Sequence, residues 1–442
     1  MKTIMPPTML SQKLIGKQKY VETNVYRLSR FVIQQECEAG KLLFNTLTGE
    51  LVLVSMKSQD EENRELADKF FLFPIEKDEI QICDEVRHMA RMLQNAKGAI
   101  THFTILTTTD CNARCFYCYE KGTRRFSMSS QTAQRVLEHI AAKCAGSSVK
   151  LSWFGGEPLC NWRVIDTICA GLTARGIDYT SIMTSNGFYL TPDVAQKAKR
   201  IWHMTTVQIT IDGTEETYNK TKAYRDDCLN PYERVLDNIE SALDVGLTIG
   251  IRLNMDAKNA KDLFRLADIL GERYRDRPNV HVHVEPLREF VGQIHSFGSA
   301  EELLDCYWKL TDKLIHLGLH HQKELVTKLR INQCMADSDN SEVILPDGRI
   351  AKCEHVDERE TIGNIWDSAR NEEGIASWKE IVCYPECREC PLYPLCISLK
   401  KCAWNKDGCP EHVRRGWIER VKRQMLEAYR GKHAQCRGSI DQ

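Results

Sequence analysis

Residues 111–118 read Cys-Asn-Ala-Arg-Cys-Phe-Tyr-Cys, which places three cysteines at short spacings directly after an apolar run at 103–106. Soft thiolate sulfur is a preferred ligand of iron, and short spacings on a loop let several thiolates converge on one iron–sulfur cluster. Three ligands leave one iron of a four-iron cluster open. A structural zinc site is the alternative, but it needs four closed ligands, and no fourth Cys or His follows nearby. The sequence therefore predicts a cluster held by Cys111, Cys115 and Cys118.

The pattern Cys-x3-Cys-x2-Cys, with Tyr117 before the last cysteine, resembles the signature of the radical S-adenosylmethionine (SAM) enzymes. The resemblance implies that the three thiolates hold a [4Fe–4S] cluster whose open iron binds SAM, with Tyr117 beside the cofactors. In that family an electron from the cluster cleaves SAM to a 5′-deoxyadenosyl radical, which takes a hydrogen from an unactivated carbon. The protein's part in such chemistry is placement and the exclusion of side reactions.

Composition sets limits on the class of protein. The 442 residues are enough for two or three domains, and the net charge of −1 gives no reason to expect a nucleic acid or an anionic membrane as partner. No apolar run approaches the roughly 18 residues that span a bilayer, and residues 1–20 lack a signal-peptide core. We therefore expect a cytoplasmic protein whose 19 cysteines serve metal ligation rather than disulfides. Five isolated cysteines are expected to be buried small hydrophobes: Cys37, Cys83, Cys144, Cys169 and Cys228.

Residues 1–100 read as a small module of their own. β-rich runs at 26–36, 41–45 and 50–56 predict a three-stranded meander, and residues 62–70 and 78–94 have helical spacing on either side of Pro74. Strands followed by helices suggest a winged-helix-like α+β unit. In radical SAM enzymes that act on peptides, a similar module captures a leader peptide by adding it as a strand to an exposed edge. The alternative is a subdomain that only caps the catalytic domain.

Residues 101–317 alternate strand-like and helix-like segments, the pattern of an α/β domain with a parallel sheet. The strand-like runs lie at 103–107, 149–154, 178–184, 205–211, 248–255 and 279–284. The resemblance implies a partial (β/α)6 TIM-like barrel, in which the functional residues lie at the carboxyl ends of the strands.

Two of these strand ends carry motifs that resemble those of the family. Gly155 and Gly156 would let the backbone approach a ligand closely, and Glu157 offers an acceptor for an ammonium group. The resemblance implies that this motif contacts the methionine amino group of SAM; a bare turn is the alternative. Ser185 and Asn186, after the third strand, suit the ribose hydroxyls or the carboxylate of SAM.

The next two strands supply further candidates. Gln208, Thr210 and Asp212 share one face of the fourth strand, and they line the cavity if that face points into the barrel. Arg252 on the fifth strand can pair with the SAM carboxylate, because its planar fork matches a carboxylate. An arginine exposed on the strand is the alternative.

Residues 318–442 are rich in cysteine and resemble the SPASM domain of radical SAM enzymes that modify peptides and proteins. A hairpin turn at Asp347-Gly348 is expected to bring Cys334 and Cys353 together. The resemblance implies two auxiliary [4Fe–4S] clusters, one on Cys387, Cys390, Cys396 and Cys409, the other on Cys334, Cys353 and Cys402.

This end of the chain also departs from the SPASM pattern. Five residues separate Cys396 from Cys402, where the usual gap is three. The fourth ligand of the second set is open between Cys383, Cys306 and a substrate thiolate. Zinc ribbons are the alternative for the dense run that begins at Cys387, because Cys-x2-Cys is also a zinc spacing. Residues 413–430 form an amphipathic helix that is expected to pack on the body of the protein through Trp417, Val421, Met425 and Ala428.

These observations predict a radical SAM peptide maturase. It would take a hydrogen from a ribosomally made precursor peptide, docked through its leader, and close a thioether or carbon–carbon cross-link. An electron donor such as flavodoxin or ferredoxin would be the second partner, and no residue stands out as the general base. The alternatives are a sulfatase-type protein maturase that forms formylglycine, a peptide epimerase, and a non-enzymatic Fe–S or zinc-binding protein. The hundred residues ahead of Cys111 count against the sulfatase type.

Overall fold

The computed structural model describes most of the chain, and its contacts divide the chain into two compact units. We call Gly98–His321 with Met335–Lys379 the barrel unit, and Met1–Lys97 with Gln322–Cys334 and Glu380–Gln442 the terminal unit. The description leaves out residues 9–14, 16–20, 22–23, 55–59, 96–97, 226–229, 288–295, 322–324, 326–327, 356–359, 368, 403–407 and 439–442.

The barrel unit is built on six parallel strands that follow one another in chain order. They are β7 (His102–Thr108), β8 (Val149–Gly155), β9 (Tyr179–Ser185), β10 (Met204–Thr210), β11 (Thr248–Met255) and β12 (Val280–Pro286). All six were predicted to within two residues at each end. The α/β class with a mostly parallel central sheet is therefore confirmed.

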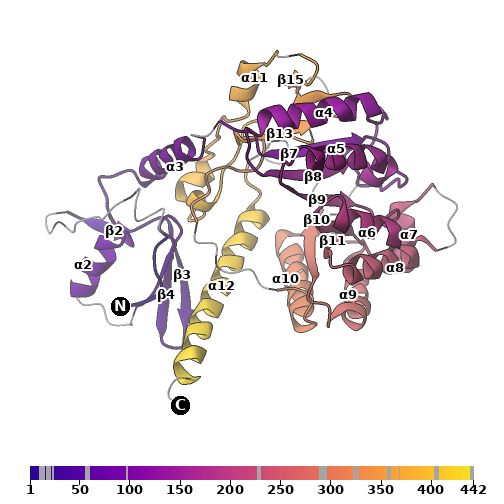
Figure 1. The fold of residues 1–442 in the computed structure, drawn as a ribbon. Coiled ribbons are helices and arrows are strands. Elements are labelled where there is room, and N and C mark those ends of the chain that lie inside the picture. The colour runs from indigo at the N-terminus through magenta and orange to yellow at the C-terminus, as the bar shows by residue number, and fades with distance from the viewer. Residues whose placement is uncertain are drawn as a thin grey trace. The chain divides into compact units, whose positions relative to one another are not determined.

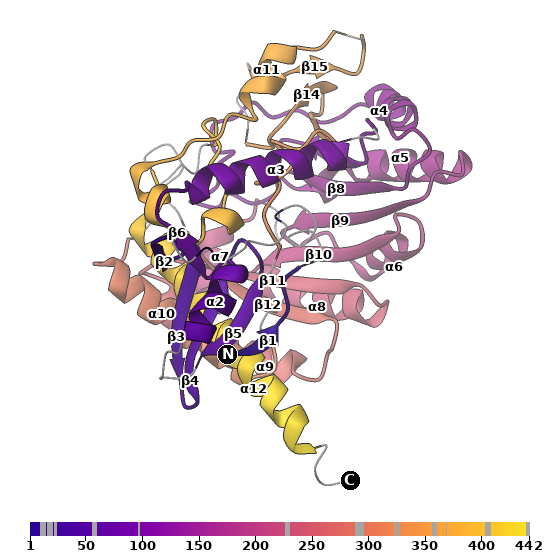
Figure 2. The same ribbon diagram turned by 90° about the vertical axis from the view of Figure 1, so that its left-hand side faces the viewer.

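Helices connect these strands and cover the outer face of the sheet. They are α4 (Ser130–Lys143), η1 (Pro158–Asn161), α5 (Trp162–Ala174), α6 (Pro192–Arg200), α7 (Glu215–Lys222), α8 (Pro231–Asp244), α9 (Ala260–Tyr274) and α10 (Ala300–His316). Figure 2 shows β8 to β11 in succession with α5, α6 and α8 along one side. The core between helices and sheet includes the fully buried Trp153 and Trp202. Because side chains alternate along a strand, Val207 and Ile209 enter this core, while Gln208 and Thr210 lie on the other face.

Three later strands extend the same sheet beyond β7. These are β13 (Ser341–Ile344), β14 (Arg349–Ala351) and β15 (Gly363–Asn364), and a short helix, α11 (Glu372–Ser377), follows them. The predicted hairpin is confirmed: β13 and β14 are antiparallel, and Gly348 takes a φ of +90° in the turn. The parallel pairing of β13 with β7, from Ser341 opposite His102 to Ile344 opposite Ile105, was not predicted.

The terminal unit contains a small antiparallel sheet in the order β1-β5-β4-β3. Its strands are β1 (Lys2–Met5), β3 (Val32–Cys37), β4 (Gly40–Asn45) and β5 (Glu50–Val54). The predicted run at 26–36 is divided, because β2 (Tyr26–Leu28) pairs instead with β6 (Leu72–Pro74). Helices α2 (Asp60–Asp68) and α3 (Glu79–Asn95) match the predicted pair.

The end of the chain belongs to this same unit. It forms η3 (Pro385–Glu389), η4 (Tyr393–Leu395) and the long helix α12 (Glu411–Gly438). Val421, Met425 and Tyr429 of α12 are buried against the small sheet, in a cluster that includes Ile33 and Phe44. Figure 1 shows α12 lying along β3.

The predicted division at residues 100 and 317 falls close to the borders of the barrel unit, whereas the predicted segment 318–442 is shared between the two units. Cys83, Cys144 and Cys169 are buried as expected, Cys37 is half-buried, and Cys228 lies outside the described residues. Within the part of the chain that the structure describes, no helix is long and apolar enough to cross a membrane.

Candidate functional site

The loop after β7 carries the three cysteines of the first motif, all of them half-buried. Cys111 Sγ accepts hydrogen bonds from the Ala113 amide at 3.3 Å and from Asn186 Nδ2 at 3.7 Å. Burial raises the pKa of Cys111 to about 12 and that of Cys118 to about 11, and it also raises the pKa of Cys115. These thiols therefore keep their protons at neutral pH unless a metal displaces them.

Gly155 and Gly156 bring the end of β8 against this cysteine loop. A Cβ atom on Gly155, whose φ is +119°, would lie 2.1 Å from the Thr108 carbonyl oxygen, and one on Gly156 would lie 2.3 Å from that of Asp110. The amides of Gly156 and Glu157 donate to these same two carbonyls at 3.0 and 2.9 Å. The close approach that the glycines permit in this structure is thus between two backbone segments; their approach to a ligand stays a prediction.

Glu157 joins the carboxyl ends of β8 and β9. Its carboxylate is fully buried and accepts from the Asn186 amide at 2.7 Å, Ser185 Oγ at 2.9 Å and the Leu159 amide at 3.1 Å. Burial raises its pKa, against the lowering effect of these hydrogen bonds. In this structure Glu157 therefore fixes Ser185 and Asn186, and its contact with SAM stays a prediction.

A polar triad lies beside the second and third cysteines; two of its members, Asp212 and Lys222, are buried, and Tyr117 is half-buried. Tyr117 Oη donates to Asp212 Oδ2 at 2.7 Å, and Lys222 Nζ lies 2.9 Å from the same oxygen and 3.2 Å from Tyr117 Oη. Burial alone would lower the pKa of Lys222, but Asp212 and its other neighbours raise it well above its usual range. Tyr117 and Asp212 were predicted as site residues. Lys222 was missed, because a lysine at the end of a polar helix carries no sequence signal of burial.

Three buried polar atoms in the cysteine loop and on Asp212 have no hydrogen-bond partner among the described residues. They are Asp212 Oδ1, Asn112 Nδ2 and Arg114 Nη2, the last of which lies 3.5 Å from Asp110 Oδ1 as an ion pair. Such atoms are costly unless a ligand or water satisfies them. Unpaired acceptor and donor atoms beside three thiols fit a polar ligand such as SAM bound next to an iron–sulfur cluster. The residues present therefore suit both SAM and the cluster.

Arg252 lies on the fifth strand as predicted, and it has neighbours that the sequence did not indicate. Its Nε donates to Asn254 Oδ1 at 2.8 Å. Burial lowers the pKa of His355, and the positive charge of Arg252 lowers it further. The His355 ring lies 4.1 Å from that of Tyr119, the residue after Cys118. The segment after β14 thereby reaches the cysteine loop.

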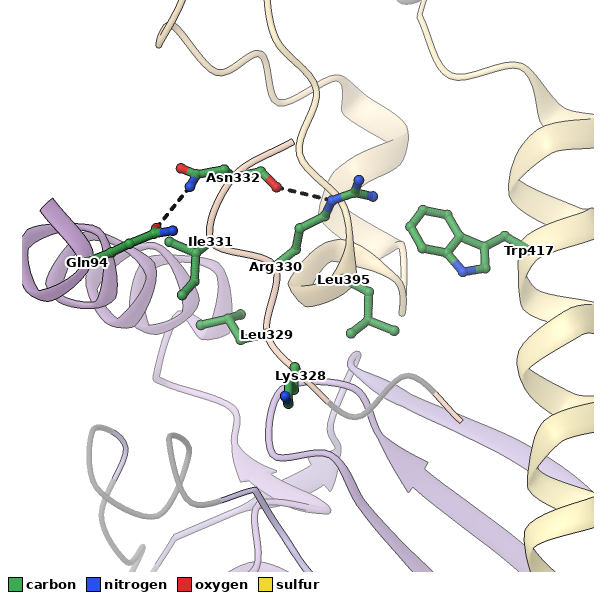
Figure 3. Close-up of a pocket in the computed structure, with 8 residues that line it drawn as sticks. All are labelled: Gln94, Lys328, Leu329, Arg330, Ile331, Asn332, Leu395 and Trp417. Atoms are coloured by element: carbon green, nitrogen blue, oxygen red, sulfur yellow. Dashed lines mark hydrogen bonds between the residues drawn. The ribbon is translucent and has the colours of Figure 1, made fainter. Parts of the chain in front are cut away.

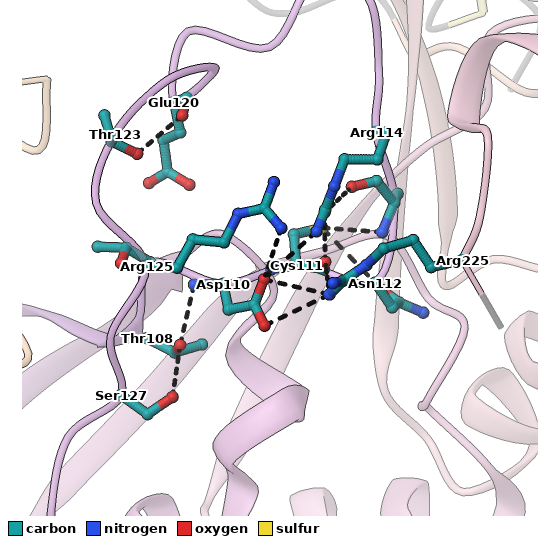
Figure 4. Close-up of polar contacts among 12 residues, drawn as sticks. Thr108, Asp110, Cys111, Asn112, Arg114, Glu120, Thr123, Arg125, Ser127 and Arg225 are labelled. Carbon is teal, nitrogen blue, oxygen red and sulfur yellow. Dashed lines mark hydrogen bonds and ion pairs between the residues drawn. The ribbon is translucent and has the colours of Figure 1, made fainter.

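Three guanidinium groups surround Asp110 at the start of the cysteine loop (Figure 4). Arg225, Arg114 and Arg125 lie 3.2, 3.5 and 3.7 Å from its Oδ1 atom. Arg225 and Arg114 also donate to the Cys111 carbonyl, at 2.7 and 2.5 Å. These contacts hold the backbone around the first cysteine in place.

No three His, Cys, Asp or Glu side chains among the described residues are arranged to bind one metal ion together. A four-iron cluster does not require this arrangement, because each thiolate binds a different iron. Fe–S clusters on these cysteines stay a prediction.

The dense cysteine run of the terminal unit comprises Cys387, Cys390, Cys396 and Cys409. Burial raises the pKa of Cys387 to about 12 and that of Cys396 to about 11. Negative charge on Cys383, Cys396 or Cys390 raises the pKa of Cys387 further, and the Cys390 amide donates to the Cys387 carbonyl at 3.2 Å. The role of these four cysteines as ligands of one cluster stays a prediction.

Arg87 of α3 holds this cysteine run in place. Its side chain is almost fully buried and donates to the carbonyls of Tyr393 at 3.0 Å, Arg330 at 3.1 Å and Cys396 at 3.3 Å. Tyr393 also stacks on Phe31, with ring centroids 6.2 Å apart. The first hundred residues therefore form the scaffold of the cysteine run.

The second predicted set of cysteines is less defined. Cys334 belongs to the terminal unit and is exposed, Cys353 belongs to the barrel unit, and Cys402 is half-buried. Of the two candidates for a fourth ligand, Cys383 lies close to Cys387, and Cys306 packs 3.8 Å from the sulfur of Met255. Neither contact joins the second set, whose ligands stay a prediction.

A pocket of about 450 Å³ lies in the terminal unit, and none of the residues that line it is a predicted site residue. It is lined by residues 328–332, Gln94, Leu395 and Trp417 (Figure 3). Asn332 Nδ2 donates to Gln94 Oε1 at 2.9 Å across its rim. We assign this pocket no role.

Comparison with known proteins identifies the barrel. Residues 105–270 match the Radical SAM superfamily, and this segment contains all three cysteines of the first loop and every predicted SAM-binding residue. These residues form a radical SAM domain. The radical SAM family implies a [4Fe–4S] cluster and SAM as cofactors.

Curated proteins that are similar to this domain in sequence carry the names of two different enzymes. A probable GTP 3′,8-cyclase of Saccharolobus solfataricus is 28% identical over 189 residues, 42% of this chain and 55% of the relative. An Fe-coproporphyrin III synthase of Methanosarcina barkeri is 23% identical over 37% of this chain and 39% of the relative. The chain spans about half the length of the cyclases that it matches.

Solved structures share the fold over more of the chain. The structure of anSMEcpe with bound AdoMet has a TM-score of 0.59 at 14% identity, over 75% of this chain and 96% of that one. SuiB of Streptococcus suis has a TM-score of 0.50 at 12% identity, over 89% of this chain and 95% of that one. At these identities the likeness establishes the fold.

Proposed function

We propose that this protein is a radical SAM enzyme that cross-links a ribosomally made precursor peptide. One observation carries the enzymatic part: three thiols share a loop whose backbone is bonded to the ends of β8 and α7, beside buried polar atoms that a ligand would satisfy. The peptide part is supported by the fold, which is also that of anSMEcpe solved with AdoMet and the Cp18Cys peptide, at a TM-score of 0.56.

Cys111, Cys115 and Cys118 would hold a [4Fe–4S] cluster, with SAM beside it. When bound, these groups supply a radical that removes a hydrogen atom from the substrate. Arg252 offers hydrogen-bond donors toward the carboxylate of SAM. Ser185 and Asn186, whose donors are bound to Glu157 and Asn112 in this structure, would contact SAM at the end of β9. Glu157 keeps Ser185 and Asn186 in place, and Asp212 offers an acceptor through its second oxygen.

The terminal unit would recognise the peptide and hold an auxiliary cluster. β3 is the last strand of its sheet, and an edge strand can accept a peptide as a further strand. Cys387, Cys390, Cys396 and Cys409 would hold one auxiliary [4Fe–4S] cluster, with Cys334, Cys353 and Cys402 as ligands of another, in the manner of a SPASM domain. A reduced flavodoxin or ferredoxin would supply electrons to the first cluster.

A sulfatase-type protein maturase and a peptide epimerase would share the same domain. The terminal unit, which joins the first hundred residues to the cysteine run, favours a dedicated peptide-binding module over the sulfatase type. The named GTP cyclases match 42% of the chain, whereas the anSMEcpe fold covers 75% of it, so the cyclase activity has less support.

The first test is SAM cleavage by the purified protein with dithionite under anaerobic conditions. We expect release of 5′-deoxyadenosine, and its loss in Cys115→Ala. Cys160→Ala is the matched control, because this exposed cysteine lies near Cys111 but outside the motif. If a protein loaded with iron releases no 5′-deoxyadenosine, the enzymatic proposal is contradicted and the non-enzymatic Fe–S protein is favoured.

The second test is the mass of a short peptide encoded beside this gene and co-expressed with the protein. Loss of two hydrogens would support an oxidative cross-link. An unchanged mass that gains one deuterium in heavy water would indicate epimerisation. No change at all, with SAM cleavage intact, would contradict the peptide proposal for that partner and favour a protein substrate.

A further inference from the structure

Lys222 is a buried cation beside the first cysteine loop. It is the last residue of α7. Its side chain is 3% exposed, and that of its ion-pair partner Asp212 is 1% exposed. An ion pair removed from water in this way costs several kcal/mol per ion in desolvation, which the attraction between the charges only partly offsets. Stability alone is therefore a weak reason for a lysine at this position.

The contacts of Lys222 bracket the second cysteine. Its carbonyl accepts from the amide of Arg114, the residue before Cys115, at 2.7 Å. Its ammonium group donates to Tyr117 Oη, two residues after Cys115, at 3.2 Å. Backbone and side chain of one residue thus hold the loop on both sides of one thiol.

The ammonium group also acts on the thiols through its charge. Its hydrogen bond to Tyr117 holds it next to the chain segment between Cys115 and Cys118. Charges interact more strongly in a buried site than in water. A cluster on these cysteines becomes more negative by one charge when an external donor adds one electron, and a fixed cation nearby stabilises that reduced form.

We propose that Lys222 is a positioning residue that holds the loop around Cys115 and raises the reduction potential of the cluster bound there. Through its ion pair it also orients Asp212, so that Oδ1 stays available to a ligand. This inference rests on the proposed function, since it assumes a cluster on Cys111, Cys115 and Cys118.

The test is the midpoint potential of the first cluster, followed by EPR during titration with dithionite in the absence of SAM and peptide. The cysteines of the terminal unit are replaced by alanine in every variant compared, so that the signal comes from one cluster. Lys222→Met is expected to shift the potential to a more negative value, whereas Lys222→Arg, which keeps the charge, should stay near the parent. Lys220→Met, on the exposed side of the same helix, is the matched control and should cause no shift.

Lys222→Met leaves Asp212 buried without its cation and could fail to fold. A second comparison avoids this problem: Asp212→Asn and the double variant Asp212→Asn/Lys222→Met differ only at Lys222. Equal midpoint potentials in this pair would overturn the electrostatic role. The same holds if Lys222→Met binds less iron while the cluster that remains keeps the midpoint potential of the parent. A parent enzyme that never cleaves SAM would contradict the proposed function and still leave the comparison of potentials valid.

Discussion

At the scale of single residues, the contact between β8 and the cysteine loop depends on the absence of a side chain at Gly156. Gly156 has no strained backbone angle. Its lack of a side chain is required by two carbonyl oxygens, those of Asp110 and Thr109, which lie 2.3 and 2.9 Å from where a Cβ would be. Both partners in this contact are backbone, so neither can turn aside as a side chain would. The loop that carries Cys111 must move if any other residue stands there.

We therefore expect Gly156→Ala to destabilise the barrel unit by about 2 kcal/mol, the usual cost of overpacking a tight site. It should also lower the iron bound by the first loop. The measurements are the urea midpoint and the iron content per chain. Gly250→Ala is the control, because nothing lies within 4 Å of a Cβ at that position of β11. Equal iron content in the two variants would contradict the role assigned to the contact.

At the scale of elements, β13 is attached to the barrel by more than its pairing with β7. Glu342 of β13 is buried and lies 2.8 Å from His139 of α4 and 3.0 Å from Arg370. Burial alone would raise the pKa of Glu342, but the hydrogen bond from His139 and the positive charge of Arg370 hold it below its usual value. A carboxyl group whose pKa is lowered by folding adds stability at pH values above the unfolded pKa, and this stability is lost as the pH falls toward the folded pKa.

We predict that the protein loses part of its stability as the pH falls below the ordinary glutamate pKa of about 4.3. Glu342→Gln should flatten this part of the profile and lower stability at pH 7 by about 2 kcal/mol, because it removes a buried, charged hydrogen-bond partner of His139 and Arg370. Urea midpoints between pH 7 and pH 3 test both effects. Glu138→Gln removes a half-exposed partner of Arg135 on α4 and should change little. Parallel profiles for Glu342→Gln and the parent would exclude Glu342 as their source.

At the scale of the whole molecule, the two ends of the chain meet in one unit. The amphipathic face of α12 covers the sheet formed by the first residues, and Met425 is fully buried in the shared cluster. The cysteine run is held in addition by Arg87 of α3. Recognition of a peptide and binding of an auxiliary cluster would therefore depend on the same core.

Met425→Ala should destabilise the terminal unit by about 3 kcal/mol through lost burial and the cavity left behind. We also expect it to lower the iron bound by the cysteine run, while the iron bound by the barrel is unchanged. Hydrogen exchange of the two units and iron content measure these effects. Arg430→Ala, on the exposed side of α12, is the control. Faster exchange in both units alike would show that they do not unfold separately.

The sequence by itself determined the elements of the barrel and the candidate ligands. Strands β7 to β12 were predictable because each is a short apolar run that borders an amphipathic helix, a pattern written within about thirty residues. Cys111, Cys115 and Cys118 were predictable because the chemistry of thiolates and their spacing are local. The position of Arg252 on its strand follows from the same periodicity.

Only the tertiary structure decided which distant segments meet. The pairing of β13 with β7 uses backbone hydrogen bonds, which leave no trace in side-chain sequence. The apolar face of α12 predicts burial but not its partner, because apolar surfaces fit many others. Lys222 could not be predicted for the same physical reason. Its role depends on its burial beside Asp212 and Tyr117, and burial is a property of the whole fold rather than of the residue.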